Sequence, residues 1–62
     1  MTLHELRALN CEKTTVYVFL RFPLFGHAKA RLIGTGRLYA RIMLADGRTL
    51  SRVSPEDIVA VV

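Results

Sequence analysis

The 62-residue chain has no tryptophan, a single cysteine and no long hydrophobic run. One cysteine, Cys11, excludes an intramolecular disulfide and is typical of a reducing compartment, so we expect a cytoplasmic protein. No run approaches the ~18 apolar residues of a membrane span. The chain also does not start with a charged segment followed by an apolar one. We therefore expect neither membrane insertion nor secretion.

Catalytic and metal-binding patterns are missing as well. His4 and His27 are far apart in the sequence, and neither stands in ligand spacing with Cys11. Neither histidine has a serine or cysteine partner that would form an activated nucleophile. The sequence predicts a protein that is not an enzyme and that uses no metal or cofactor.

Acidic residues are few and unevenly placed. Nine Lys and Arg against five Asp and Glu give a net charge of +4 and an isoelectric point near 10.0. Between Lys13 and Ala45 there is no acid at all, and the basic residues there are Lys13, Arg21, Lys29, Arg31, Arg37 and Arg41. Such unopposed charge favours a nucleic acid or an acidic protein as partner, with simple solubility as the alternative.

The clearest local pattern lies in Gly36–Val62. From Arg37 to Leu44 the residues alternate, which predicts a half-buried strand; its apolar face consists of Leu38, Ala40, Ile42 and Leu44. Asp46-Gly47 follows directly and is a strong hairpin signal, because glycine reaches positive φ without steric cost. We expect the hairpin to span residues 37–53, with Arg48–Val53 as the returning strand.

Two registers are possible for this hairpin. If Asp46 and Gly47 are the central residues of a type I′ turn, Arg41 lies opposite Arg52, and facing like charges are destabilising. If Ala45-Asp46 form a type I turn with Gly47 as a bulge residue, Arg41 faces Ser51 and Ile42 faces Leu50. We favour the bulged register because it buries an apolar pair and separates the arginines.

The hairpin is followed by a helix start and a last strand. Ser54 suits an N-cap, Pro55 the first helical position, and Glu56 and Asp57 the first turn. Only one turn fits, over residues 55–57. The β-branched run Ile58–Val62 then predicts a short strand covered by the rest of the protein.

The first half of the chain predicts a helix and further strands. Thr2 and Glu5 form a capping box for a helix over residues 3–9. Thr14–Phe22 should be a strand buried on much of both faces, which Pro23 ends or confines to an edge. His27–Ile33 fits either an amphipathic strand or a helical turn, and Gly34–Gly36 a bend or bulge in a curved sheet.

The order strand, hairpin, strand, helical turn and strand in Gly36–Val62 resembles the end of SH3-like small barrels, including their Tudor, Sm-like and KOW-type relatives. The resemblance implies a mainly β fold: one small SH3-like barrel domain over residues 1–62, with about five short strands and the short N-terminal helix. Barrels of this kind mostly bind peptides, RNA, DNA or their own copies. It therefore implies a binding module, by analogy of fold alone.

Two candidate surfaces follow, and they define two hypotheses. In the first, a small regulatory module binds nucleic acid, because an aromatic ring between two guanidinium groups suits phosphates flanking a stacked base. Its contact face consists of Arg37, Tyr39 and Arg41, supported by Arg48, Arg31 and Lys29. In the second, the module binds a protein partner and acts as a regulator or inhibitor, for instance one from a bacterial virus or mobile element.

The second hypothesis depends on the apolar Phe22–Gly26 loop. Its anchors would be Phe22, Leu24 and Phe25, with the basic residues as a rim. The same loop has another interpretation, in which it folds back and plugs one end of the barrel; exposed, it would mark an interaction site. Because 52% of the residues are hydrophobic, more than so small a core needs, we also expect a homo-oligomer.

Overall fold

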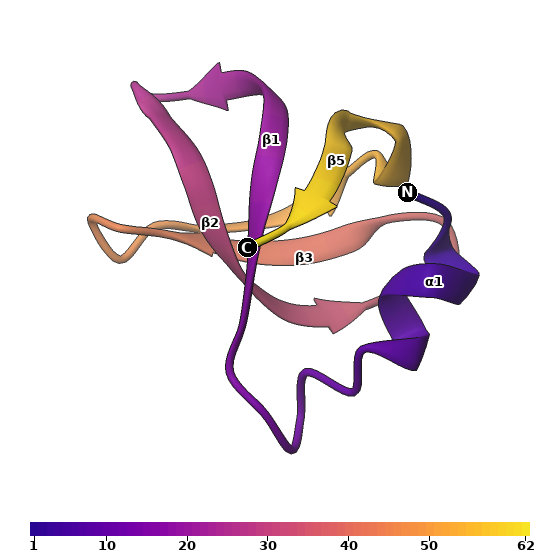
Figure 1. Ribbon diagram of the computed structural model, residues 1–62. Helices are drawn as coiled ribbons and strands as arrows, with labels where there is room; N and C mark the ends of the chain where they lie inside the picture. The colour runs from indigo at the N-terminus through magenta and orange to yellow at the C-terminus, as the bar shows by residue number, and fades with distance from the viewer.

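The computed structural model describes all 62 residues as one antiparallel sheet with a short helix at its N-terminal end (Figure 1). The elements are α1 (Leu3–Ala8), β1 (Val16–Leu24), β2 (His27–Thr35), β3 (Ala40–Leu44), β4 (Thr49–Val53), the 3₁₀ turn η1 (Pro55–Asp57) and β5 (Ile58–Val61). A mainly β fold of five short strands is thus confirmed. None of its helical segments has the length and apolar character needed to cross a membrane.

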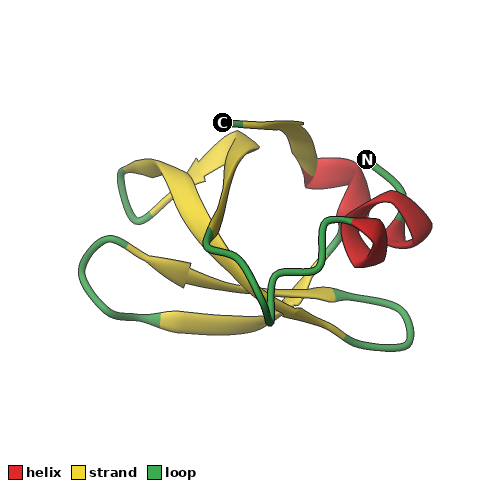
Figure 2. Ribbon diagram, turned by 60° about the horizontal axis from the view of Figure 1, so that its bottom comes forward, coloured by secondary structure: helices red, strands yellow, loops and turns green.

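The strands follow the order β4-β3-β2-β1-β5, so only β5 is paired out of chain order, with β1. The sheet is strongly bent, and its strands curve around one inner face (Figure 2). Inward side chains of all five strands and of α1 form a single core: Leu6, Val16, Val18, Leu20, Ala30, Leu32, Ala40, Ile42, Leu44, Val53 and Ile58. β4 and β5 are the two edges, and they are not paired with each other.

Helix α1 begins at the predicted capping box. The hydroxyl of Thr2 accepts a hydrogen bond from the Glu5 N–H at 3.1 Å, and the Glu5 carboxylate accepts one from the Thr2 N–H at 3.0 Å. So short a helix is unstable alone. It is held because Leu6 is fully buried against the sheet.

The capping box makes the stability of α1 depend on pH. The Thr2 backbone N–H holds the pKa of Glu5 below its ordinary value, and the Thr2 side chain acts in the same direction. A lowered carboxyl pKa gives stability that is complete above the unfolded pKa and is lost as the pH falls through the folded pKa. We expect Glu5→Gln to remove this acid-dependent part. Urea midpoints of the two proteins should therefore converge as the pH is lowered from 6 toward 3, and parallel curves would contradict this.

The β3–β4 hairpin adopts the bulged register. Ile42 is paired with Leu50, and the loop is closed by the Leu44 N–H donating to the Arg48 carbonyl and the Gly47 N–H to the Leu44 carbonyl. Gly47 has φ +92°, as a bulge glycine requires. A second irregularity between Ala40 and Ile42 inserts a residue in β4. That shift keeps Val53 buried and leaves Arg52 exposed.

Three expectations about strand ends and faces are wrong. Strand β1 is buried on one face only, and it continues through Pro23, in a stretch where its pairing with β2 is irregular. Strand β5 is not covered, since only Ile58 is buried in it. The strand predicted from Arg37 begins at Ala40, because Gly36–Tyr39 forms the turn between β2 and β3, and Leu38 at its tip is 68% exposed.

The remaining local expectations are mostly confirmed. His27–Ile33 lies in a strand, and the register of β2 against β3 shifts between Leu32 and Gly34, as expected for a bulge. Ser54 occupies the N-cap of η1, but its side chain makes no hydrogen bond there. The turn is instead closed by the Asp57 N–H donating to the Ser54 carbonyl at 3.0 Å.

Candidate nucleic-acid interface

The outer face of β1 and β2 carries two aromatic rings beside two cations. Tyr17 and Phe19 alternate along β1 with the buried Val16, Val18 and Leu20, so both rings point away from the core. Across the ladder, Tyr17 is paired with Arg31 and Phe19 with Lys29. Each of the two aromatic residues is 43% exposed. We call these four residues the aromatic-basic platform.

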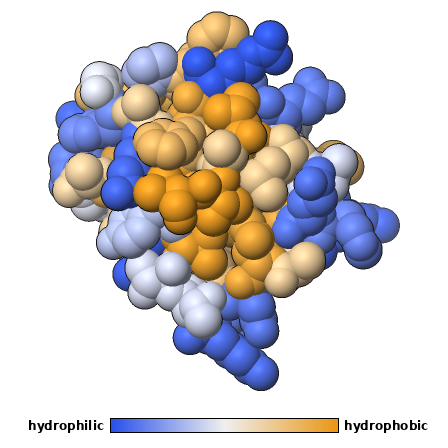
Figure 3. Space-filling view, viewed as in Figure 1, coloured by the Kyte–Doolittle hydropathy of each residue, from blue (hydrophilic) through white to orange (hydrophobic).

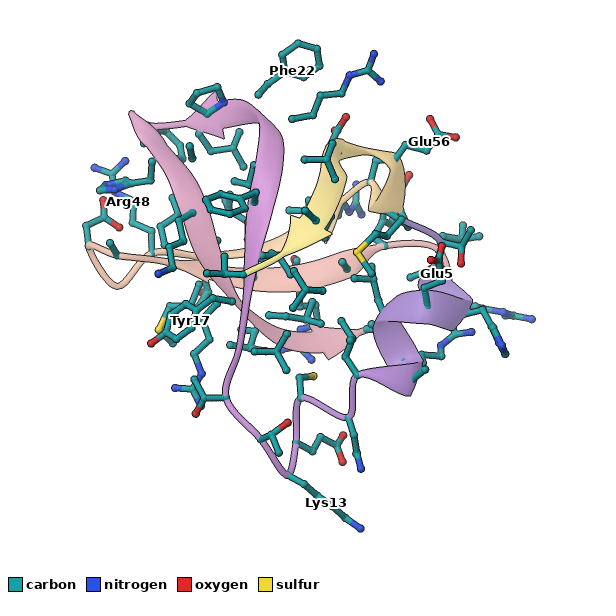
Figure 4. The ribbon with its side chains drawn as sticks, viewed as in Figure 1. Glu5, Lys13, Tyr17, Phe22, Arg48 and Glu56 are labelled. Carbon is teal, nitrogen blue, oxygen red and sulfur yellow. The ribbon has the colours of Figure 1, made fainter.

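One contact within the platform brings a positive charge onto a ring. The Lys29 Nζ lies 4.9 Å from the centroid of the Tyr17 ring, a diagonal cation–π contact between neighbouring strands. Tyr17, Lys29 and Arg31, with Met43 of β3, also line an open groove of about 430 Å³ that runs toward Ala45. Figure 4 shows Tyr17 on the side of the sheet away from α1.

The platform is not neutralised by acids. The only ion pair between permanently charged side chains joins Asp46 of the β3–β4 turn to Arg48 at 3.2 Å, and the His27 Nε2 lies 3.7 Å from the same carboxylate. Neither Lys29 nor Arg31 has an acidic side chain within ion-pair distance. Side chains two residues apart on a strand are about 6.6 Å apart. The two cations thus lie close together on the outer face, with the Lys29 ammonium leaning toward the Tyr17 ring opposite Arg31.

The structure does not unite the three residues expected to form the contact face. Arg37 and Tyr39 lie in the turn before β3, beside a shallow hollow that includes Arg52. Arg41 lies on β3, where its side chain packs over Gly34. If Gly34 carried a Cβ atom, that atom would lie 3.7 Å from the Arg41 Cδ. The Arg41 side chain lines a separate hollow with Cys11.

Arg48 is engaged rather than free. Its backbone N–H donates to the Asp46 carboxylate at 3.0 Å, and its guanidinium lies 4.6 Å from the centroid of the Phe25 ring. It therefore joins the tips of the β1–β2 and β3–β4 hairpins. Of the six residues predicted from sequence to contact nucleic acid, only Lys29 and Arg31 belong to the platform.

Tyr17 and Phe19 were missed by the sequence reasoning. The signal was present as a period-two alternation, because Tyr17, Phe19 and Arg21 share one face of the run and Val16, Val18 and Leu20 the other. Since both faces are apolar over most of this run, the pattern reads as a strand buried on both sides. An arginine on the aromatic face was the one indication that this face meets water.

The apolar Phe22–Gly26 segment is exposed, so the interpretation as a barrel plug is wrong. Phe22 is 64% and Phe25 61% exposed, and Phe22 stands clear of the sheet in Figure 4. Leu24 is half-buried and packs against the core. A hollow of about 590 Å³ lies between this segment and β4; its lining includes Leu20, Phe22, Leu24, Phe25, Leu50 and Arg52.

Phe25 occupies a strained position. Leu24 is paired with His27, so Phe25 and Gly26 are the centre of a two-residue turn, with φ of +50° and +82°. Positive φ at both positions defines a type I′ turn, which favours Asn or Gly at the first. For a bulky L-residue this conformation costs about 1–2 kcal/mol.

We expect Phe25→Asn to stabilise the fold by roughly 0.5–1 kcal/mol, because the strain relieved exceeds the exposed Arg48–Phe25 contact that is lost. Urea denaturation followed by circular dichroism measures this. Phe22→Asn is the matched control, since Phe22 is equally exposed but is not among the residues with positive φ. An equal gain from both substitutions would mean that removing any exposed phenylalanine stabilises the chain.

The rest of the surface shows no grouping of three His, Cys, Asp or Glu side chains that could hold a metal ion. No protein-family model, no curated protein and no solved structure matches the chain. Its function is therefore argued from its own surface.

Proposed function

We propose that this protein is a small, basic, non-enzymatic module that binds single-stranded DNA or RNA on its aromatic-basic platform. The observation that carries the proposal is the exposure of Tyr17 and Phe19 on one face of an inner strand, beside Lys29 and Arg31, which have no acidic partner. We propose further that it is a cytoplasmic regulatory protein.

The chemistry of the platform fits unpaired bases. Stacking of a base on an aromatic side chain contributes about 1–3 kcal/mol and needs a free base face, which a duplex does not offer. Tyr17 and Phe19 lie two residues apart, about 6.6 Å along the strand. The Phe19 ring can therefore receive a base directly, and the Tyr17 ring can receive the next one once the Lys29 ammonium moves off its face. Lys29 and Arg31 then attract the phosphates of the same strand.

The architecture supports a binding module of the SH3-like class. A sheet in which the last strand returns to pair with β1, after a 3₁₀ turn behind β4, has the connections that this class uses. We propose that the bent sheet is such a barrel. Arg37, Tyr39, Arg41 and Arg48 then contribute general electrostatic attraction outside the platform.

The proposal is tested by fluorescence anisotropy with labelled single-stranded DNA, single-stranded RNA and a duplex, between about 50 and about 200 mM salt. Binding to the single strands should weaken with salt, with a slope near −0.7 per phosphate contact, or about −1.4 from Lys29 and Arg31 together. The duplex should bind more weakly. Absence of binding at the lowest salt, or a preference for the duplex, would overturn the proposal.

A second candidate function rests on the exposed phenylalanines. Phe22 and Phe25 flank the 590 Å³ hollow beside β4, and exposed apolar surface of this kind marks protein interfaces. In this function the protein binds an acidic protein partner, with Phe25 as its anchor. A pull-down from nuclease-treated bacterial lysate tests it. The anchor role fails if Phe25→Asp retains the same stoichiometric partner as the parent protein.

A further inference from the structure

Two hollows adjoin each other along β4. The apolar hollow of about 590 Å³ lies between the end of β1 and β4, and an open hollow of about 490 Å³ lies beside the turn that precedes β3. Ser51 and Arg52 line both hollows. We call this joined surface the β4 groove. Its apolar end consists of Leu20, Phe22, Leu24, Phe25 and Leu50, and its basic end of Arg37, Tyr39 and Arg52.

The apolar end of the groove has a leucine floor and an aromatic rim. Leu20 is buried, and Leu24 and Leu50 are half-buried. Phe22 and Phe25 are exposed at the rim. One wall belongs to β1, which also lies under the hydrophobic area at the centre of the space-filling view (Figure 3). An apolar side chain placed in this hollow would remove leucine surface from water, which stabilises a complex.

The basic end of the groove is free to bind a carboxylate. Arg37 and Arg52 are exposed, and neither has an acidic side chain within ion-pair distance. A planar guanidinium binds a carboxylate through two parallel hydrogen bonds. The only acid of the groove, Asp57, lines the apolar hollow alone. It repels a carboxylate there, so the acidic groups of a ligand are directed to Arg37 and Arg52.

The groove also offers free backbone groups at a sheet edge. β4 has a neighbouring strand on one side only, and its ladder with β3 is regular from Arg48 to Leu50, before the bulge. The Arg48 carbonyl accepts from the Leu44 N–H, so it points toward β3. The next residue, Thr49, lines the apolar hollow and directs its N–H and C=O away from β3. Such groups pair with an extended chain, which adds to the sheet as a further strand.

We propose that the β4 groove binds an extended acidic peptide segment of a partner protein. One large apolar side chain of the segment fills the apolar hollow, and an Asp or Glu of the same segment binds Arg37 and Arg52. The two side chains stand two or four positions apart, because every second residue of an extended chain lies on the same face. This inference rests on the second candidate function, since it gives the chemistry of the partner that this function requires.

Charge selects this occupant. The net charge of +4 attracts an acidic segment over a long range and repels a second copy of the chain. The apolar and basic parts of the groove are separate, whereas rings and cations face each other directly in the aromatic-basic platform. A segment that carries its apolar and acidic side chains at different positions matches this separation. The groove and the platform share no residue, so each can be tested alone.

Selection from a random library of short peptides displayed on phage tests the chemistry of the occupant. The selected peptides should combine a large apolar residue with an Asp or Glu two or four positions away. In anisotropy titrations, replacing the apolar residue by alanine or the acid by glutamine should weaken binding by about tenfold or more. A selection that enriches no peptide, or only basic or uncharged peptides, overturns the proposal.

Arg52→Glu tests the site itself. The selected peptide should bind this variant at least about tenfold more weakly, because charge-assisted hydrogen bonds are lost. The circular dichroism spectrum should not change, since Arg52 is exposed. Lys13→Glu is the matched control: it makes the same change in net charge, and Lys13 projects from the loop before β1, outside both hollows (Figure 4). Its affinity should stay within about twofold, because a distant exposed charge is screened. Equal losses in both variants overturn the assignment of the site.

Competition separates this inference from the two proposed functions. A short single-stranded oligonucleotide should leave the bound peptide in place at moderate salt, and displacement of the peptide would overturn a separate site. A stoichiometric partner recovered by pull-down should be released by the peptide. A partner that depends on Phe25 but is not released leaves the second candidate function standing and overturns only the acidic segment.

Discussion

Replacing Phe19 by alanine is expected to weaken binding of a single-stranded oligonucleotide by about 5- to 150-fold. The factor corresponds to the roughly 1–3 kcal/mol that one base gains by stacking on an aromatic side chain. Because the Phe19 ring is 43% exposed and lies outside the core cluster, the fold should survive the change. Anisotropy titration measures the affinity, and circular dichroism verifies the fold.

Phe22→Ala is the matched control for this experiment. Phe22 is more exposed than Phe19 but lies beyond the platform, so its loss should leave the affinity within about twofold, well below one stacking contact. Phe19→Tyr should retain binding because it keeps an aromatic face. Equal losses for Phe19→Ala and Phe22→Ala would contradict a localised site, and so would an unchanged affinity after Phe19→Ala.

Replacing Ile42 by alanine is expected to destabilise the fold by about 2–5 kcal/mol, through lost burial and the cavity left behind. Ile42 is fully buried in β3, where it is paired with Leu32 on one side and Leu50 on the other. A domain of this size has about 3–9 kcal/mol in total, from roughly 0.05–0.15 kcal/mol per residue. The variant should therefore lose a large share of its total stability.

Urea denaturation followed by far-ultraviolet circular dichroism measures this loss. The neighbouring Met43 is the control because its side chain lies on the outer face, beside the platform. Met43→Ala should cost clearly less than Ile42→Ala, since the Met43 side chain is only partly buried. Comparable losses at both positions would mean that the outer face is covered, which would contradict the assignment of the core to one side of the sheet.

Features set by neighbouring residues could be predicted from the sequence. The Thr2–Glu5 capping box, the bulged turn at Gly47 and the 3₁₀ turn at Pro55 depend on side chains within three or four positions of each other. Their chemistry is complete in a short segment. Each lies where the sequence predicts it, although Ser54 makes no side-chain cap.

Features set by distant partners could not be predicted in the same way. Tyr17 and Phe19 look like core residues until β1 is seen to have neighbours on both edges but no layer over its outer face. The exposure of Val59 and Val61 follows likewise from the edge position of β5. The sequence places a loop at Phe22–Gly26, but Phe25 at positive φ is an unusual turn residue, so the tight two-residue turn at Phe25-Gly26 was not predicted.

The candidate site in the structure differs from the one predicted from sequence for a related reason. Arg37, Tyr39 and Arg41 alternate as if on one strand, but the Gly36 N–H donates to the Tyr39 carbonyl at 2.7 Å, which makes this segment a turn. Their alternation therefore does not put them on one face. Lys29 and Arg31 remain part of the candidate site because β2 is regular over these residues, so both side chains lie on its outer face.

The most direct test of the account is a nuclear magnetic resonance titration of the labelled protein with a short single-stranded oligonucleotide. The account predicts that the largest chemical-shift changes fall on Tyr17, Phe19, Lys29 and Arg31, and that they shrink as salt is raised. Changes confined to the Phe22–Phe25 hollow, or no changes at low salt, would contradict binding on the outer face of β1 and β2.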